Sequence, residues 1–117
     1  AADETGTGRG LGWTLNVPLK FGISRETYIS EFERALSRAV EQCRPQLILI
    51  SAGFDAHRED PIGSLGLEVE DFGTLTRLVV DASSITAGGR IVSLLEGGYN
   101  VDRLAESVEL HLEQLSK

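Results

Sequence analysis

The sequence has no methionine and only one cysteine among its 117 residues. Because it does not begin with methionine, we expect a processed chain or a fragment of a longer protein. The lone cysteine, Cys43, excludes an internal disulfide and any zinc cluster built from several cysteines.

Long apolar runs and positive charge are also scarce. No apolar run approaches the roughly 20 residues that span a bilayer, and no signal-peptide pattern opens the chain. We therefore expect no membrane contact and a cytoplasmic location. The net charge of −7 argues against a nucleic-acid partner, because phosphate backbones require clustered lysine and arginine.

Apolar residues at three- and four-residue spacing predict three helices, over residues 24–43, 69–87 and 100–117. Ser24 and Asn100 are the expected N-caps of the first and third helices. The second helix is expected to bury Phe72, Leu75, Val79, Ala82 and Ile85. The third is expected to bury Val101, Leu104, Ala105, Val108, Leu112 and Leu115.

Short apolar segments between these helices predict three strands, over residues 13–19, 46–51 and 90–95, after a loop over residues 1–12. The order β-α-β-α-β-α predicts an α/β fold with a parallel sheet and right-handed crossovers. The continuous apolar runs in the last two strands are typical of strands buried on both faces. Three strands make a thin sheet, so we expect further strands upstream.

Two loops follow the ends of successive predicted strands, "AGFDAHREDPIG" and "EGGYN". Ligands of open parallel sheets bind beyond such ends, so we expect Asp55 and Tyr99 to face one crevice. From the local pattern, Asp55 is a metal ligand, a hydrogen-bond anchor for its loop, or a solvated acid. Tyr99 is either a hydrogen-bond donor to a developing oxyanion or a half-buried packing residue.

Neighbouring polar residues favour structural roles. His57 lies two residues after Asp55, but alternate side chains of an extended loop need not converge, so we expect a structural or second-shell role. Asp60, before Pro61, is expected to bond nearby backbone amides in a turn. His111, in the middle of the last helix, is expected to be a surface or packing histidine.

"LILISAGFDAHREDPIG" and "GGRIVSLLEGGYN" together resemble the zinc-dependent histone deacetylase and acetylpolyamine amidohydrolase superfamily, and "GTGRGLGWTLNVPL" is similar to that family's glycine-alternating segment. The resemblance implies an arginase-like α/β fold and hydrolysis of acetyl-lysine or acetylpolyamine amides. It implies that Asp55 is a zinc ligand and that Tyr99 stabilises the oxyanion. It places Gly97 and Gly98 in the loop that lines the acyl tunnel. Ile62 stands where polyamine-preferring members can carry an acid.

The resemblance also shows what this chain does not contain. The family's other aspartate and histidine zinc ligands and its histidine pair, the general base, have no counterpart among these residues. We therefore expect residues 1–117 to be the C-terminal part of a deacetylase, inactive alone and without bound zinc. The alternative is a non-catalytic α/β interaction module that forms homo-oligomers through uncovered sheet surface.

Overall fold

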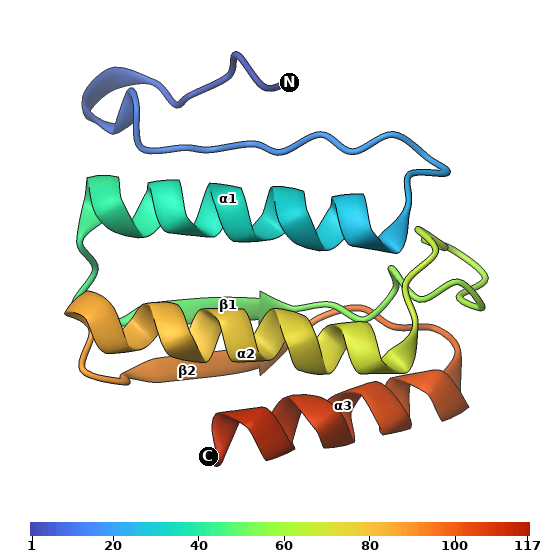
Figure 1. The fold of residues 1–117 in the computed structure, drawn as a ribbon. Coiled ribbons are helices and arrows are strands. Elements are labelled where there is room, and N and C mark those ends of the chain that lie inside the picture. The colour runs from blue at the N-terminus through green and yellow to red at the C-terminus, as the bar shows by residue number, and fades with distance from the viewer.

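Three α-helices alternate with two β-strands along the chain (Figure 1). The computed structural model describes residues 1–117. The elements are η1 (Gly8–Gly10), α1 (Arg25–Cys43), β1 (Ile48–Ala52), α2 (Val69–Thr86), β2 (Ile91–Leu95) and α3 (Val101–Leu115). The predicted α/β class and all three predicted helices are confirmed. None of these helices combines the length and apolarity needed to cross a membrane.

The helices begin at side chains that satisfy their first free amide groups. Ser24 Oγ accepts a hydrogen bond from the Thr27 amide at 3.1 Å, and Asn100 Oδ1 accepts one from the Arg103 amide at 3.2 Å. Both N-caps were predicted from the sequence. At α2, Glu68 and Asp71 form a reciprocal capping box. The start of each helix is thus determined locally.

The two strands pair in parallel, from Ile48 opposite Ile91 to Ala52 opposite Leu95. The first and last residues of β1 and β2 are therefore paired, and both strands end at the same edge of the sheet. The loops that leave this edge are those that contain Asp55 and Tyr99.

The predicted strand over residues 13–19 is wrong, so the sheet has two strands and not three. Figure 1 shows this segment running along the outer side of α1, away from β1. From Leu15 to Leu19 no backbone group bonds to another backbone group. A strand requires a neighbouring ladder, and this extended segment has none.

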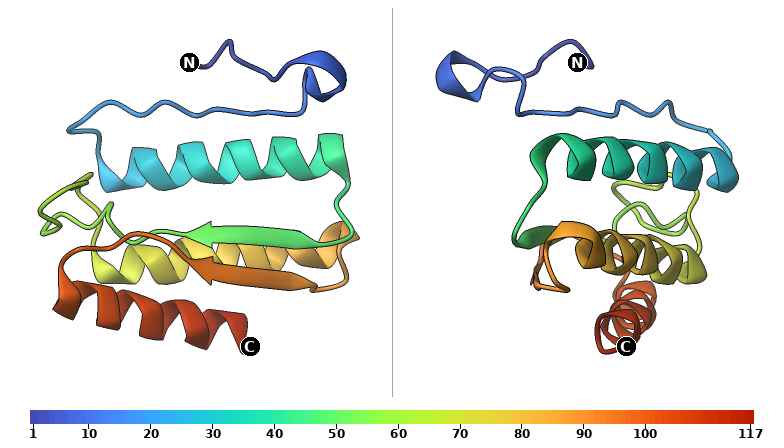
Figure 2. Two further views of the ribbon diagram at one scale, coloured as in Figure 1. Left: turned by 180° about the vertical axis from the view of Figure 1, so that it is seen from behind. Right: turned by 60° about the vertical axis from the view of Figure 1, so that its left-hand side comes forward.

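The prediction that β1 and β2 are buried on both faces is also wrong. Seen from behind in Figure 2, both strands lie in front of α2, and no helix covers them from that side. The side chains on this face are exposed, namely Leu49, Ser51, Val92 and Leu94. The helical layer covers only one face, with α2 packed against both α1 and α3.

The hydrophobic core lies under the loop that follows β1. Its buried members are Ala52, Phe54, Ala56, Leu67 and Phe72. The rings of Phe54 and Phe72 pack with their centroids 5.2 Å apart. Since Phe54 and Ala56 flank Asp55 in the sequence, the core directly supports the backbone of the loop that carries this acid.

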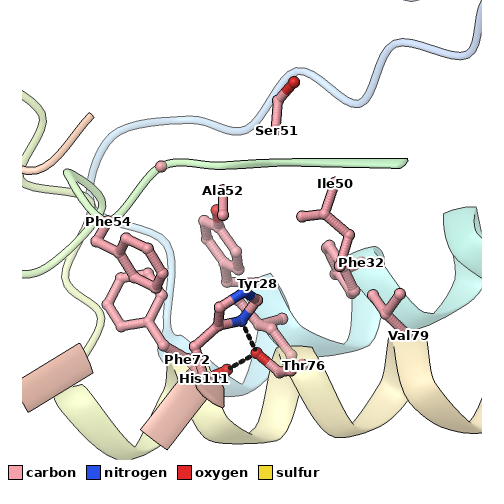
Figure 3. Close-up of a pocket in the computed structure, with 12 residues that line it drawn as sticks. Tyr28, Phe32, Ile50, Ser51, Ala52, Phe54, Phe72, Thr76, Val79 and His111 are labelled. Carbon is pink, nitrogen blue, oxygen red and sulfur yellow. Dashed lines mark hydrogen bonds between the residues drawn. The ribbon is translucent and has the colours of Figure 1, made fainter. Parts of the chain in front are cut away.

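Helix α3 presents polar side chains to the core. His111 is buried, with Nδ1 2.7 Å from Thr76 Oγ1 (Figure 3). Its Nε2 lies 2.8 Å from Ser93 Oγ. Thr76 donates its own proton to the Phe72 carbonyl oxygen, so His111 Nδ1–H donates to Thr76, and in the neutral ring Nε2 then accepts from Ser93. Burial lowers the pKa of His111, which favours this neutral form.

These contacts correct the expected buried faces of two helices. Ser107 and His111 are buried on α3, whereas Val101 and Leu112 are 76% and 57% exposed. On α2, Ile85 is 67% exposed although the pattern had placed it inside. His111 is thus a packing histidine and not a surface one, and its hydrogen bonds determine which face of α3 turns inward.

Candidate functional site

The loops after β1 and β2 stay paired beyond the strands. The Glu96 amide donates to the Ala52 carbonyl oxygen at 2.9 Å, and the Phe54 amide donates to the Gly97 carbonyl oxygen at 2.9 Å. These bonds continue the parallel ladder, so the residues that follow leave the sheet side by side. Asp55 and Tyr99 are brought together in this way.

The Asp55 carboxylate and the Tyr99 hydroxyl both lie next to the position that a side chain of Gly97 would occupy. A methyl group at Gly97 would lie 3.2 Å from Asp55 Oδ2 and 3.4 Å from the Tyr99 hydroxyl oxygen. Both polar groups therefore border the same small space, as the sequence led us to expect. Glycine at this position keeps that space open.

Asp55 is half-buried, and no hydrogen bond within the protein ends on its carboxylate. Tyr28, on α1, lies near it: burial and then the negative charge of Asp55 raise the pKa of the Tyr28 phenol. Tyr28 lies within the first predicted helix, and nothing in the sequence pattern links it to Asp55. The Tyr99 side chain is 52% exposed and accessible from solvent.

The loop that carries Asp55 folds back on itself at Gly63. The Ser64 amide donates to the Asp55 carbonyl oxygen at 2.9 Å. A methyl group at Gly63 would lie 2.1 Å from that same oxygen, closer than any real contact. Only glycine permits this approach, which holds the Asp55 backbone in place.

Asp60 lies within this loop and is 5% exposed. Its Oδ1 accepts hydrogen bonds from the Ile62 amide at 2.8 Å and the Gly63 amide at 3.0 Å. Its Oδ2 accepts one from the Tyr99 amide at 2.8 Å. Burial alone would raise the pKa of the Asp60 carboxyl, but these amide donors outweigh it and hold that pKa below its ordinary value.

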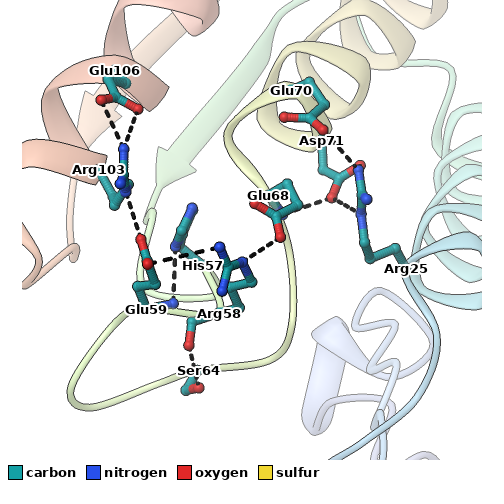
Figure 4. Close-up of polar contacts among 10 residues, drawn as sticks. All are labelled: Arg25, His57, Arg58, Glu59, Ser64, Glu68, Glu70, Asp71, Arg103 and Glu106. Atoms are coloured by element: carbon teal, nitrogen blue, oxygen red, sulfur yellow. Dashed lines mark hydrogen bonds and ion pairs between the residues drawn. The ribbon is translucent and has the colours of Figure 1, made fainter.

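His57 does not share a site with Asp55. It is 2% exposed, and its Nδ1 accepts a hydrogen bond from the Glu59 amide at 3.0 Å (Figure 4). It borders a separate charged hollow, together with Arg58, Glu59 and Glu68 among others. A structural role for His57 is consistent with this placement but stays a prediction.

The residues present do not complete a zinc site. No three or more histidine, cysteine, aspartate or glutamate side chains are placed to hold a metal ion together. A catalytic zinc needs three protein ligands, and Asp55 is one half-buried carboxylate with free lone pairs. This chain therefore supplies only one ligand to a metal ion, the Asp55 carboxylate.

The other expected substrate-contacting residues lie at different places. Gly98 has a φ of 134°, and a methyl group there would lie 2.7 Å from Leu104 Cδ1 and 3.3 Å from Phe54 Cβ. Gly98 is thus needed for backbone geometry and close packing. Ile62 is 69% exposed on the turn after Asp60. Their roles toward a substrate stay predictions.

Ion pairs on the surface link the loop to α2 and α3 (Figure 4). Arg103 Nε lies 2.6 Å from Glu59 Oε2, and Arg58 pairs with Glu68. Hydrogen bonding from Arg103, together with its positive charge, lowers the pKa of Glu59. Such exposed pairs contribute little to stability, and no sequence motif identified them.

The family model described as histone deacetylase domain matches residues 1–115. The chain is 41% identical over 99 residues to the histone deacetylase-like amidohydrolase of Pseudomonas aeruginosa, covering 85% of this chain and 26% of that protein. It is 39% identical over 115 residues to the human polyamine deacetylase HDAC10, covering 97% and 17%. The crystal structure of the HDA15 HD domain matches with a TM-score of 0.87 and 33% identity, over 98% of this chain and 32% of that one. The chain thus spans about a third or less of each of these proteins.

Proposed function

The chain belongs to the histone deacetylase family, and on that premise we propose that it forms part of the active site of a deacetylase that hydrolyses the amide of an acetylated amine. The observation that carries the proposal is that the Asp55 carboxylate and the Tyr99 hydroxyl border the same small space beside Gly97. One group is suited to hold a metal ion and the other to donate a hydrogen bond. An acetylated lysine or polyamine is the substrate class, in keeping with the names of the relatives.

Tyr99 is the proposed catalytic residue. Its hydroxyl would donate a hydrogen bond to the carbonyl oxygen of the substrate as negative charge develops there, and such donors act mainly on the transition state. Gly97 would leave room for the reacting carbonyl, while Gly98 and Ile62 would contact the remainder of the substrate.

Asp55 is the proposed zinc ligand of this chain. Zinc polarises a carbonyl group and activates water where its ligands are complete. This chain supplies one ligand, so the metal would be held only together with ligands that these 117 residues do not provide. Residues 1–117 alone would therefore be inactive, as the missing histidine pair also implies.

A calorimetric zinc titration of the 117-residue chain tests this division of the site. We expect no tight binding by the chain or by its Asp55→Asn variant, and no deacetylation of an acetyl-lysine peptide or an N-acetylated polyamine by either. In the intact deacetylase, Asp55→Asn should weaken zinc binding by more than the roughly 10- to 100-fold typical of losing an outer-shell partner.

The control is Asp81→Asn, because Asp81 is an exposed acid on α2 far along the chain from the loop. It should leave zinc binding and activity unchanged. Zinc binding by the chain alone that disappears in Asp55→Asn and persists in Asp81→Asn would disprove the single-ligand hypothesis. An intact protein that keeps its zinc and activity after Asp55→Asn would disprove the proposed function.

A second candidate function, a self-associating interaction module, is favoured by the open face of the sheet. Leu49, Val92 and Leu94 are 66%, 46% and 57% exposed on adjacent strands. A contiguous apolar face next to unpaired strand edges favours association. In sedimentation velocity, such a module would form dimers as its concentration rises, and Leu49→Glu would abolish them.

Leu112→Glu is the control, since Leu112 is equally apolar and 57% exposed but lies on α3. It should leave the dimers intact. A chain that remains monomeric at every concentration would eliminate this second candidate and leave the deacetylase proposal unaffected.

A further inference from the structure

One buried carboxylate joins the two loops of the candidate site. Asp60 is 5% exposed, and both of its oxygens accept backbone hydrogen bonds. Oδ1 serves the turn of its own loop, through the Ile62 and Gly63 amides. Oδ2 serves the neighbouring loop, through the Tyr99 amide 39 residues later in the sequence. One oxygen thus binds its own loop and the other binds the neighbouring loop.

Asp60 binds the amide of Tyr99 itself, between Gly97, whose carbonyl oxygen bonds the Phe54 amide, and Asn100, which caps α3. The Tyr99 side chain is half-exposed, and no hydrogen bond from the protein holds its hydroxyl. Gly97 and Gly98 precede it, and glycine leaves the backbone freer than any other residue. The direction in which the phenol points therefore depends strongly on how the Tyr99 backbone is held.

Asp60 also connects Tyr99 to Asp55. The turn that Oδ1 stabilises contains Gly63, which approaches the Asp55 carbonyl oxygen closely. The next residue, Ser64, donates its amide hydrogen to that oxygen, and the two contacts hold the Asp55 backbone. The same side chain therefore stabilises the backbone beneath the carboxylate and the backbone beneath the hydroxyl. Asp60 thus joins the two loops through its two oxygens.

We infer that Asp60 is a positioning residue, which fixes the Tyr99 hydroxyl relative to the Asp55 carboxylate by binding the Tyr99 amide. This inference rests on the proposed function, because positioning has a catalytic consequence only if the Tyr99 hydroxyl acts on the substrate. It assigns to Asp60 more than the turn that the sequence predicted. Misplacing a catalytic group by about 1 Å can cost on the order of 100-fold in rate.

The first test is amide hydrogen exchange of the 117-residue chain by NMR. In Asp60→Ala, which removes both acceptors, the Tyr99 amide should exchange about 10-fold faster or more, as expected for losing a hydrogen bond to a charged group. Amides in the middle of α2 report whether the variant remains folded. Glu59→Gln is the control, because Glu59 bridges the same loop to α3 through Arg103 without contacting the Tyr99 amide.

Unchanged exchange at Tyr99 in folded Asp60→Ala would overturn the inference, as would equally faster exchange in Glu59→Gln. Asp60→Asn provides a second, nearly isosteric variant. The asparagine side chain has one acceptor oxygen, so it cannot accept from the turn and from Tyr99 at once. Either the Ile62 and Gly63 amides or the Tyr99 amide should therefore exchange faster.

The second test is a double-mutant cycle in the intact deacetylase, with Asp60→Asn and Tyr99→Phe. Asp60→Asn should lower kcat about 10-fold or more and leave KM nearly unchanged. In the Tyr99→Phe background the same change should cost clearly less, because the hydroxyl that Asp60 positions is gone and only its support of the Asp55 backbone remains. A purely structural role would give the same cost in both backgrounds.

The outcomes separate this inference from the proposed function. An active enzyme with additive losses would overturn the positioning role alone. An unsubstituted enzyme without deacetylase activity would overturn the proposed function and with it the catalytic consequence of Asp60. The exchange result would still show whether the bond to Tyr99 stabilises the loop.

Discussion

Replacing Tyr99 with phenylalanine should lower the kcat of the intact deacetylase by about 100- to 1,000-fold, the usual cost of losing one donor to a developing oxyanion. The change removes one oxygen and keeps the ring, so the half-exposed side chain should occupy the same place. Zinc content should stay the same, because Asp55 is untouched. KM should change little, since the lost hydrogen bond strengthens mainly in the transition state.

The comparison variant is Tyr28→Phe, the other tyrosine of the chain. Tyr28 packs against the core, and its phenol is not placed beside Gly97, so kcat should fall far less. Steady-state kinetics with metal analysis of each sample distinguishes the cases. Similar losses in the two variants, or a lower zinc content in Tyr99→Phe, would contradict the role assigned to the Tyr99 hydroxyl.

The sequence predicted those parts of the fold that short segments determine. The three helices follow from apolar spacing and from caps such as Ser24 and Asn100, which act within one turn of the chain. The segment over residues 13–19 has the alternation of a strand, but a strand also requires a partner ladder, which a sequence pattern does not reveal. The open face of β1 and β2 has the same origin, because burial depends on what packs against the strand.

The inward face of α3 shows a different limit. Apolar spacing alone favours Val101 and Leu112, yet His111 and Ser107 are the buried side chains. His111 is buried because Thr76 on α2 and Ser93 on β2 satisfy both ring nitrogens. Hydrogen bonds between distant elements thus overrode the hydrophobic pattern, and no local signal could have indicated them.

In the candidate site, the approach of Asp55 and Tyr99 was predictable because parallel strands end at a common edge. The contacts that fix them were not. The bond from the Tyr99 amide to Asp60 and the approach of Gly63 to the Asp55 carbonyl oxygen depend on the path of a loop between two strands. A turn at Asp60 was expected from Pro61, but the second oxygen of the acid had no predicted partner.

Replacing Leu67 with alanine should lower the free energy of unfolding by about 3 kcal/mol, within the range for buried leucines. Leu67 is 0% exposed and belongs to the core cluster beneath the site. Its amide donates to the Ala56 carbonyl oxygen at 3.1 Å, and its own carbonyl oxygen accepts from the Arg58 amide at 2.8 Å. The side chain thus anchors the returning end of the loop that carries Asp55, as Phe54 anchors its start.

Leu112→Ala is the matched control, because the same substitution at a 57% exposed position of α3 removes little buried surface and alanine favours helix. Urea unfolding followed by far-UV circular dichroism should give a large loss for Leu67→Ala and almost none for Leu112→Ala. Because the loop is held at both ends by the core, faster amide exchange should extend from Leu67 to Asp55. Equal stabilities of the two variants would mean that the loop is not held by the core, and the rigid placement of Asp55 opposite Tyr99 would then lack its physical basis.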